Sequence, residues 1–149
     1  MAAAALVAWF IERQRDRWHH RAEPITQEMR QRLNGYFSEE DLGRVRLAEN
    51  VRLPLPILPG VAAITFDHLV LARQPVWESL LFHELVHVTQ FRLLGVRQFS
   101  EQYVQGFLQT RRYESIPLEA CAFALEERFL RGAGPFPVET EVRRWLSLR

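Results

Sequence analysis

The segment from residue 75 to residue 94 constrains the fold of this chain more than any other. It reads PVWESLLFHELVHVTQFRLL, opens at a proline and is followed by Gly95, as helices prefer. Apolar side chains cover almost the whole circumference of such a helix, so the sequence predicts a helix buried inside the protein. Two imidazoles and a carboxylate on a buried helix are costly unless they are hydrogen-bonded or bind a metal.

Within this segment, His83 and His87 stand four residues apart, and Glu84 follows His83 directly. On an α-helix this spacing projects both imidazoles from one face, about one turn apart. Two neutral imidazoles placed in this way can bind one Zn²⁺, and Glu84 can then reach the bound water as a general base. The alternative is a pair of hydrogen-bonded core histidines. The glutamate between the histidines favours the metal site.

A catalytic zinc site usually has three protein ligands, and the single Cys121 excludes a cysteine-based site. Glu119 lies near the start of a predicted helix, residues 118–131, whose small side chains allow a close approach to the histidines. We favour it over Glu114 in the preceding loop, although Glu119 alone would fit a role at its own helix terminus. Gln90 is expected to support or pack against the site. Glu126 is expected to be solvated.

The chain of 149 residues predicts one compact unit, in which we separate an N-terminal helical segment, residues 1–35, from the main part, residues 36–149. Its 48% hydrophobic and 25% charged residues are typical of a soluble globular protein. A net charge of +1 gives no reason to expect a nucleic-acid partner. The oligomeric state stays open.

Residues 2–11 form an apolar run that is too short to span a bilayer and lacks the flanks of a signal peptide. It continues into charged residues up to Trp18, which predicts one helix. We therefore expect a cytoplasmic protein without membrane association. Anchoring of this helix to a membrane is the alternative.

The remaining pattern predicts an α+β fold, in which a small antiparallel sheet packs on the buried histidine helix between flanking helices. The two β-rich runs 61–66 and 69–73 form a hairpin with Asp67 and His68 at its turn. The prolines between residues 53 and 60 indicate an extended loop. Further helices are predicted over 24–36, 100–113 and 138–148, together with a short helix from Ser38 to Gly43 and a strand over 44–48. The helix over 100–113 is expected to begin at Ser100, with Tyr103, Phe107 and Leu108 facing inward.

The run HELVHVTQ, with AAITFDHLVLAR before it and PLEACAFALEERF after it, resembles the gluzincin metallopeptidases. The likeness is closest to the compact bacterial metallopeptidase-like domain associated with extracellular contractile injection systems, and it covers residues 36–130. It implies a zincin-like fold with His83 and His87 as zinc ligands, Glu84 as general base and a downstream glutamate as third ligand. It also implies that the strand 62–66 lines the cleft and pairs with an extended substrate.

The likeness does not reach the C-terminal domain of larger gluzincins, so the group that stabilises the oxyanion stays unassigned. Tyr113 is the first candidate, with His68 and Arg112 behind it. The predicted function is that of a zinc-dependent peptidase acting on a peptide or protein substrate. The alternative is a zinc-stabilised, non-catalytic binding or assembly module, although such a module has no need of Glu84.

Overall fold

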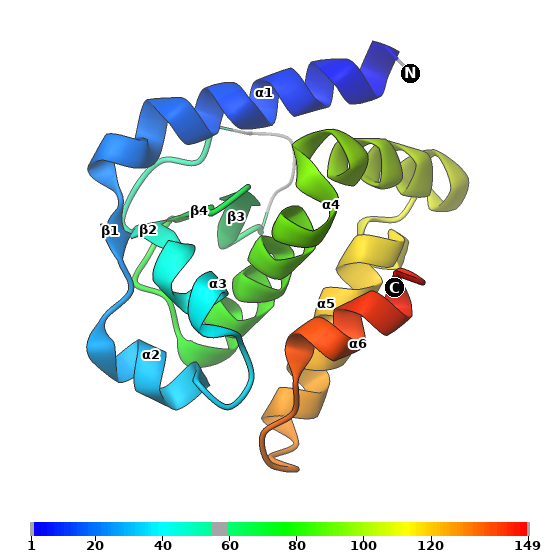
Figure 1. The fold of residues 1–149 in the computed structure, drawn as a ribbon. Helices are drawn as coiled ribbons and strands as arrows, with labels where there is room; N and C mark the ends of the chain where they lie inside the picture. The colour runs from blue at the N-terminus through cyan, green and yellow to red at the C-terminus, as the bar shows by residue number, and fades with distance from the viewer. Residues whose placement is uncertain (1, 55–59, 149) are drawn as a thin grey trace.

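The computed structural model describes residues 2–54 and 60–148 of the chain. In this part, a small sheet lies beside a long helix, α4 (Glu78–Thr110), and the other helices lie around the two (Figure 1). This mixture of helices and strands agrees with the predicted α+β class. The other elements are α1 (Ala2–Trp18), α2 (Gln27–Leu33), α3 (Glu39–Arg44), α5 (Pro117–Leu130), α6 (Val138–Trp145) and the 3-10 turns η1 (His19–Arg21) and η2 (Tyr113–Ser115).

The predicted hairpin is confirmed by two strands, β3 (Ala63–Phe66) and β4 (Leu69–Ala72), that pair antiparallel. Asp67 in the turn between them has a positive φ of 62°. Aspartate tolerates this left-handed conformation better than most residues, which lets the turn form without a glycine. Much of the loop predicted over 53–60 lies outside the described residues.

The prediction of a purely antiparallel sheet is wrong. Two more strands, β1 (Glu23–Pro24) and β2 (Arg46–Ala48), give the order β1-β2-β4-β3, and β2 runs parallel to β4. All four residues of β4 are fully buried. The most apolar strand therefore takes the central position, and β2 pairs with it instead of with β3. This leaves β3 at the edge of the sheet.

The register of the hairpin decides which backbone groups of β3 face that edge. The amide of Arg73 donates to the carbonyl of Ala62 over 3.0 Å, so these two residues form a hydrogen-bonded pair. Bonded and non-bonded pairs alternate along an antiparallel ladder. Ile64 therefore bonds to β4, whereas the N–H and C=O groups of Ala63 and Thr65 point to the free edge.

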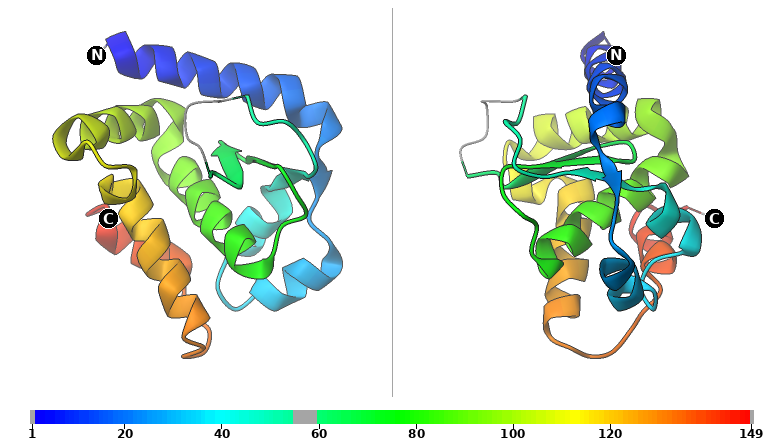
Figure 2. Two further views of the ribbon diagram at one scale, coloured as in Figure 1. Left: turned by 180° about the vertical axis from the view of Figure 1, so that it is seen from behind. Right: turned by 90° about the vertical axis from the view of Figure 1, so that its left-hand side faces the viewer.

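Helix α4 is two helical segments joined at Gly95, where φ is 77° and ψ is 159°. The predicted break at this glycine is confirmed. The predicted start of the next helix at Ser100 is wrong, because the helix resumes directly after Gly95. The Ser100 hydroxyl is instead buried within that second segment and donates to the carbonyl of Val96, one turn earlier, over 2.8 Å. After the break, α4 runs beside α1 (Figures 1 and 2).

The helix predicted over 24–36 is shorter at both ends. Pro24 belongs to β1, and Thr26 caps α2 by accepting a hydrogen bond from the Met29 amide over 3.1 Å. Ser38 caps α3 in the same way, and each cap contributes about 1 kcal/mol to helix stability. Gly43 lies inside α3 and does not end it.

Two apolar clusters form the core, and α4 contributes to both. Its Phe82, Leu85 and Val86 belong to the cluster that also contains residues of α2, α5 and α6. Its Phe91, Leu94 and Phe99 belong to the cluster that contains Leu69 and Leu71 of β4. The histidine helix is thus buried, as its sequence predicts. No helix in residues 2–54 and 60–148 combines the length and apolar character needed to cross a membrane.

Helix α1 packs against the second segment of α4 and against β3 (Figure 1). The ring of Phe10 meets that of Phe66 edge-to-face, with 5.8 Å between centroids. Nearer its C-terminal end, Arg15 forms an ion pair with Asp67 of the hairpin turn over 3.2 Å. Apolar and ionic contacts together fix α1 over one side of the sheet.

Candidate metal centre

Helix α4 carries His83 and His87 on one face, in its most buried stretch. Each residue is only 5% exposed. Because four residues complete slightly more than one turn, the two rings lie side by side, with centroids 5.0 Å apart. Their Nε2 atoms are 3.2 Å apart.

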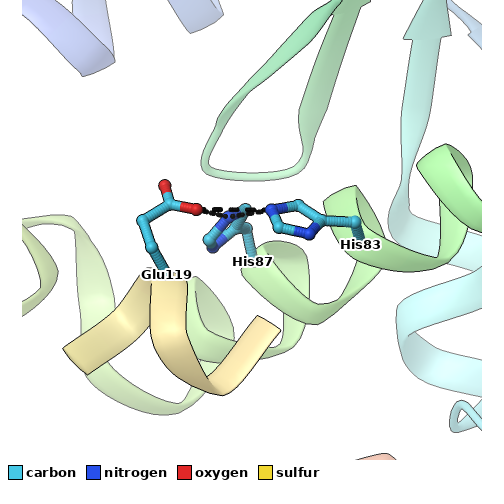
Figure 3. A group of neighbouring side chains, drawn as sticks. All are labelled: His83, His87 and Glu119. Carbon is cyan, nitrogen blue, oxygen red and sulfur yellow. Dashed lines mark hydrogen bonds and ion pairs between the residues drawn. The ribbon is translucent and has the colours of Figure 1, made fainter. Parts of the chain in front are cut away.

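Helix α5 brings Glu119 to the same point. Pro117 starts this helix, and the buried Cys121 and Ala122 are small enough to let it lie close against α4. Gly106 of α4 helps, because a Cβ at that position would come within 2.8 Å of the Pro117 ring. Glu119 is 4% exposed and its side chain points at the two imidazoles (Figure 3).

The three side chains form a group that can hold a metal ion. Oε2 of Glu119 lies 3.3 Å from Nε2 of His83 and 3.1 Å from Nε2 of His87. Ligands at the 2.0–2.1 Å bond lengths of zinc, in a tetrahedron, are about 3.3 Å apart. The observed triangle has sides of 3.1–3.3 Å. The residues therefore already stand at the spacing of three corners of such a site.

Partners behind the histidines direct both Nε2 atoms inward. Nδ1 of His87 lies 2.8 Å from Oε1 of Gln90, whose amide nitrogen donates to the Leu118 carbonyl over 3.0 Å. The amide oxygen of Gln90 therefore faces His87, so Nδ1 donates to it and Nε2 is the nitrogen turned toward His83 and Glu119. This contact agrees with the supporting role expected of Gln90.

Glu126 contacts Nδ1 of His83, as Gln90 contacts Nδ1 of His87. Its Oε1 lies 3.1 Å from Nδ1 of His83, and its side chain is only 22% exposed. The expectation that Glu126 is solvated is wrong. Seven residues, about two turns, separate it from Glu119, so both side chains project from the same face of α5 toward α4.

Tyr103 holds the third member of the group. Its hydroxyl donates to Oε1 of Glu119 over 3.1 Å, which leaves Oε2 for the histidines. The sequence predicts only that Tyr103 faces inward, together with Phe107 and Leu108; for these two the prediction is wrong, because they are 46% and 48% exposed. Tyr103 reaches Glu119 because the break at Gly95 redirects the second segment of α4, and the sequence signals the break but not its angle.

The charges of the group are strongly coupled in the metal-free protein. Burial alone would raise the pKa of Glu119, but His87 and His83 outweigh it and hold this pKa well below its usual range. Burial alone would lower the pKa of His83, but hydrogen bonds to Glu119 and Glu126 raise it to about 10. The pKa of His87 is also raised, because Glu119 outweighs burial. The carboxylate and the two imidazoles thus favour each other's charged forms.

Glu84 lies beside the group without joining it. It is 5% exposed, and its Oε2 accepts a hydrogen bond of 2.5 Å from the Thr65 hydroxyl on β3. Its Oε1 accepts no hydrogen bond from any residue that the structure describes. Burial raises the pKa of Glu84, although the two histidines oppose this effect.

A cavity of about 180 Å³ adjoins these side chains. Helix α1, strand β3, the second segment of α4 and the η2 turn form its walls, which are mainly apolar, and Glu84, His87 and Glu119 contribute its carboxylate and imidazole groups. The lining residues are Val7, Phe10, Ile11, Val61, Ala63, Ile64, Thr65, Phe66, Glu84, His87, Phe99, Tyr103, Tyr113 and Glu119.

Of the remaining candidate residues, Tyr113 lies at the cavity, whereas Glu114, Arg112 and His68, all in the described part of the chain, are not among its lining residues. Tyr113 lines the cavity, and burial together with the Glu119 charge raises the pKa of its hydroxyl, which therefore stays protonated. Glu114, the alternative third ligand, is exposed and pairs with Arg112 over 3.0 Å. His68 lies at the hairpin turn against His19, with the rings 5.2 Å apart.

Comparisons of the chain with protein-family models, with curated proteins and with solved structures find no match.

Proposed function

We propose that this protein is a zinc-dependent peptidase with a zincin-like fold, in which His83, His87 and Glu119 hold the metal. One observation carries the proposal. Two Nε2 atoms and one carboxylate oxygen converge to within 3.3 Å of one another, beside a cavity that also contains Glu84. The resemblance to the gluzincins implies His83 and His87 as ligands, Glu84 as general base and a downstream glutamate as third ligand, which agrees with this proposal.

The donor set supports zinc as the metal. Two imidazole nitrogens and one carboxylate oxygen are typical of catalytic zinc sites, which leave a further position for water. When bound, zinc supplies a water of lowered pKa and polarises a carbonyl group. The outward hydrogen bonds of both Nδ1 atoms hold the rings ready for such an ion.

Glu84 is the general base in this proposal. Its free Oε1 accepts the proton of the attacking water and returns it to the amine that leaves. Burial raises its pKa, so this carboxylate binds a proton more readily than an exposed glutamate does. Tyr113 keeps its proton at neutral pH and is the candidate that donates a hydrogen bond to the oxyanion.

Strand β3 supports a peptide as the substrate. The N–H and C=O groups of Ala63 and Thr65 face the free edge of the sheet, next to the cavity. An extended peptide can pair with such an edge through its own backbone, whatever its side chains are. A non-catalytic binding module could also use this edge, but it would have no need of Glu84 as a base.

The test compares the wild type with Glu84→Gln, which keeps the volume of the side chain and removes the base. We expect about one zinc per chain in both proteins, but a loss of casein hydrolysis of about 10²–10⁴-fold in the variant. Glu127→Gln, at an exposed residue of the same type on α5, is the matched control and should cleave like the wild type.

Two results would contradict the proposal. The first is a purified protein that binds no zinc, or binds another metal in its place. The second is a zinc-loaded wild type that cleaves no member of a broad peptide library, which would favour the non-catalytic module.

A further inference from the structure

Thr65 is the polar residue of an otherwise apolar strand. Its neighbours in β3 are Ala63, Ile64 and Phe66, and a valine would suit the pleated, buried position equally well. Among residues 2–54 and 60–148, the hydroxyl nevertheless has one partner: it lies 2.5 Å from Oε2 of Glu84 and 3.4 Å from the Glu84 carbonyl. The shorter contact takes its single proton.

This hydrogen bond makes the two oxygens of the Glu84 carboxylate different from each other. One oxygen is held by β3, and the other accepts no hydrogen bond from the described residues. A glutamate has three rotatable side-chain bonds, so without a partner its carboxylate would sample several directions. With Oε2 fixed, Oε1 keeps one direction within the cavity.

Thr65 also belongs to the part of β3 that faces the free edge. Its backbone groups point away from β4, as the register of the hairpin requires, while its side chain reaches α4. The hydroxyl of Thr65 therefore bonds to Glu84, while the backbone N–H and C=O groups of Thr65 are available to a peptide that pairs with β3.

We propose that Thr65 is a positioning residue that aligns Glu84 with a peptide bound along β3. This inference rests on the proposed function: the Thr65 hydroxyl would set the orientation of Glu84, the proposed general base. A misplacement of about 1 Å at a reacting group can cost about 10²-fold in rate, so the hydroxyl is expected to matter for turnover more than for binding.

The test removes and restores the hydroxyl. Thr65→Val keeps the shape of the side chain, and we expect kcat to fall about 10²-fold with KM within about twofold of the wild type and zinc content unchanged. Thr65→Ser should recover most of the lost kcat. Ser100→Ala is the matched control, because it removes a buried hydroxyl that does not contact Glu84, and its kcat should stay within about twofold of the wild type.

A second measurement does not depend on turnover. Acetohydroxamic acid chelates zinc and presents a protonated oxygen that requires an acceptor near the metal. Its Kd, measured by calorimetry, should be about 10-fold weaker in Thr65→Val. In a Glu84→Gln background the same change should have almost no effect, because the two residues act as one unit.

The outcomes separate this inference from the proposed function. A zinc-loaded wild type without hydrolysis, but with the Thr65–Glu84 coupling in hydroxamate binding, would refute the peptidase and support the arrangement. An active wild type whose Thr65→Val variant has unchanged kcat and unchanged hydroxamate affinity would refute the inference alone. An equal effect of Thr65→Val with and without Glu84 would also refute it.

Discussion

The Tyr103 hydroxyl donates a hydrogen bond to Oε1 of Glu119 and so ties the second segment of α4 to the carboxylate that faces both histidines. Tyr103→Phe removes this bond and keeps the ring. We expect zinc affinity to fall about 10-fold or more, as is usual when a partner behind a ligand is lost. Competition with a zinc chelator measures it. Tyr36→Phe, at a tyrosine packed against Phe82 in the core, is the control, and an equal loss there would assign the effect to stability.

Replacing the proposed ligands should separate Glu119 from its alternative. His83→Ala and Glu119→Ala each remove a corner of the triangle, so zinc content measured by mass spectrometry should collapse in the first and fall sharply in the second. Glu114→Ala changes an exposed carboxylate and should keep the full content. The reverse result for the two glutamates would mean that the third ligand is misassigned.

Zinc binding should release protons at pH 7. In the metal-free protein the pKa of His83 is raised to about 10, so its imidazole is protonated there and must lose the proton to bind zinc. Calorimetry in two buffers with different heats of ionisation should therefore show release of about one proton or more per zinc. Equal heats in both buffers would mean that the histidines are neutral without metal.

The same pKa shifts predict how the stability of the metal-free protein depends on pH. The folded pKa of His83, about 10, lies above its usual value of 6.5, so its contribution is complete below pH 6.5 and is lost as pH rises through 10. The pKa of Glu119 is lowered from 4.5, so its contribution is complete above pH 4.5 and is lost in stronger acid. Thermal unfolding of the apoprotein should show stability declining from pH 6.5 to 10. A flat or rising profile over that range would contradict the assignment.

Peptide binding should depend on the alternation along β3. Ala63→Pro removes an N–H that faces the free edge, so it should weaken peptide affinity while the fold survives. Ile64→Pro removes a hydrogen bond to β4 and should lower the thermal stability instead. Peptide affinity measured on the inactive Glu84→Gln protein distinguishes the two. Unchanged affinity in a folded Ala63→Pro variant would place the peptide elsewhere.

Local features of this chain could be predicted from its sequence, because their signals lie within a few residues. The spacing of His83 and His87, the glycine at position 95 and the hairpin turn at Asp67 are of this kind. The order of the strands could not be predicted in the same way. It depends on whether β2 pairs with β3 or with β4, and the observed pairing of β2 with β4 joins residues more than twenty positions apart.

Two residues of the site show where pattern reasoning stops. Glu126 could have been recognised, because it lies two turns after Glu119 and therefore on the same face of the predicted helix. Tyr103 could not be assigned to Glu119 without the angle at Gly95, which no periodicity encodes. The metal-binding group could be predicted from the sequence because its strongest signal, the spacing of His83 and His87, lies within four residues.

The break at Gly95 makes the architecture of the site depend on the left-handed backbone conformation of a single, achiral residue. An L-alanine there would meet no atom within 4 Å, so its cost would be conformational, arising from a φ of 77° that L-residues resist. A D-alanine, introduced by chemical ligation of peptide fragments, favours that φ. The D-alanine variant should therefore keep the Tyr103–Glu119 hydrogen bond, whereas L-alanine disfavours the backbone conformation on which this bond depends.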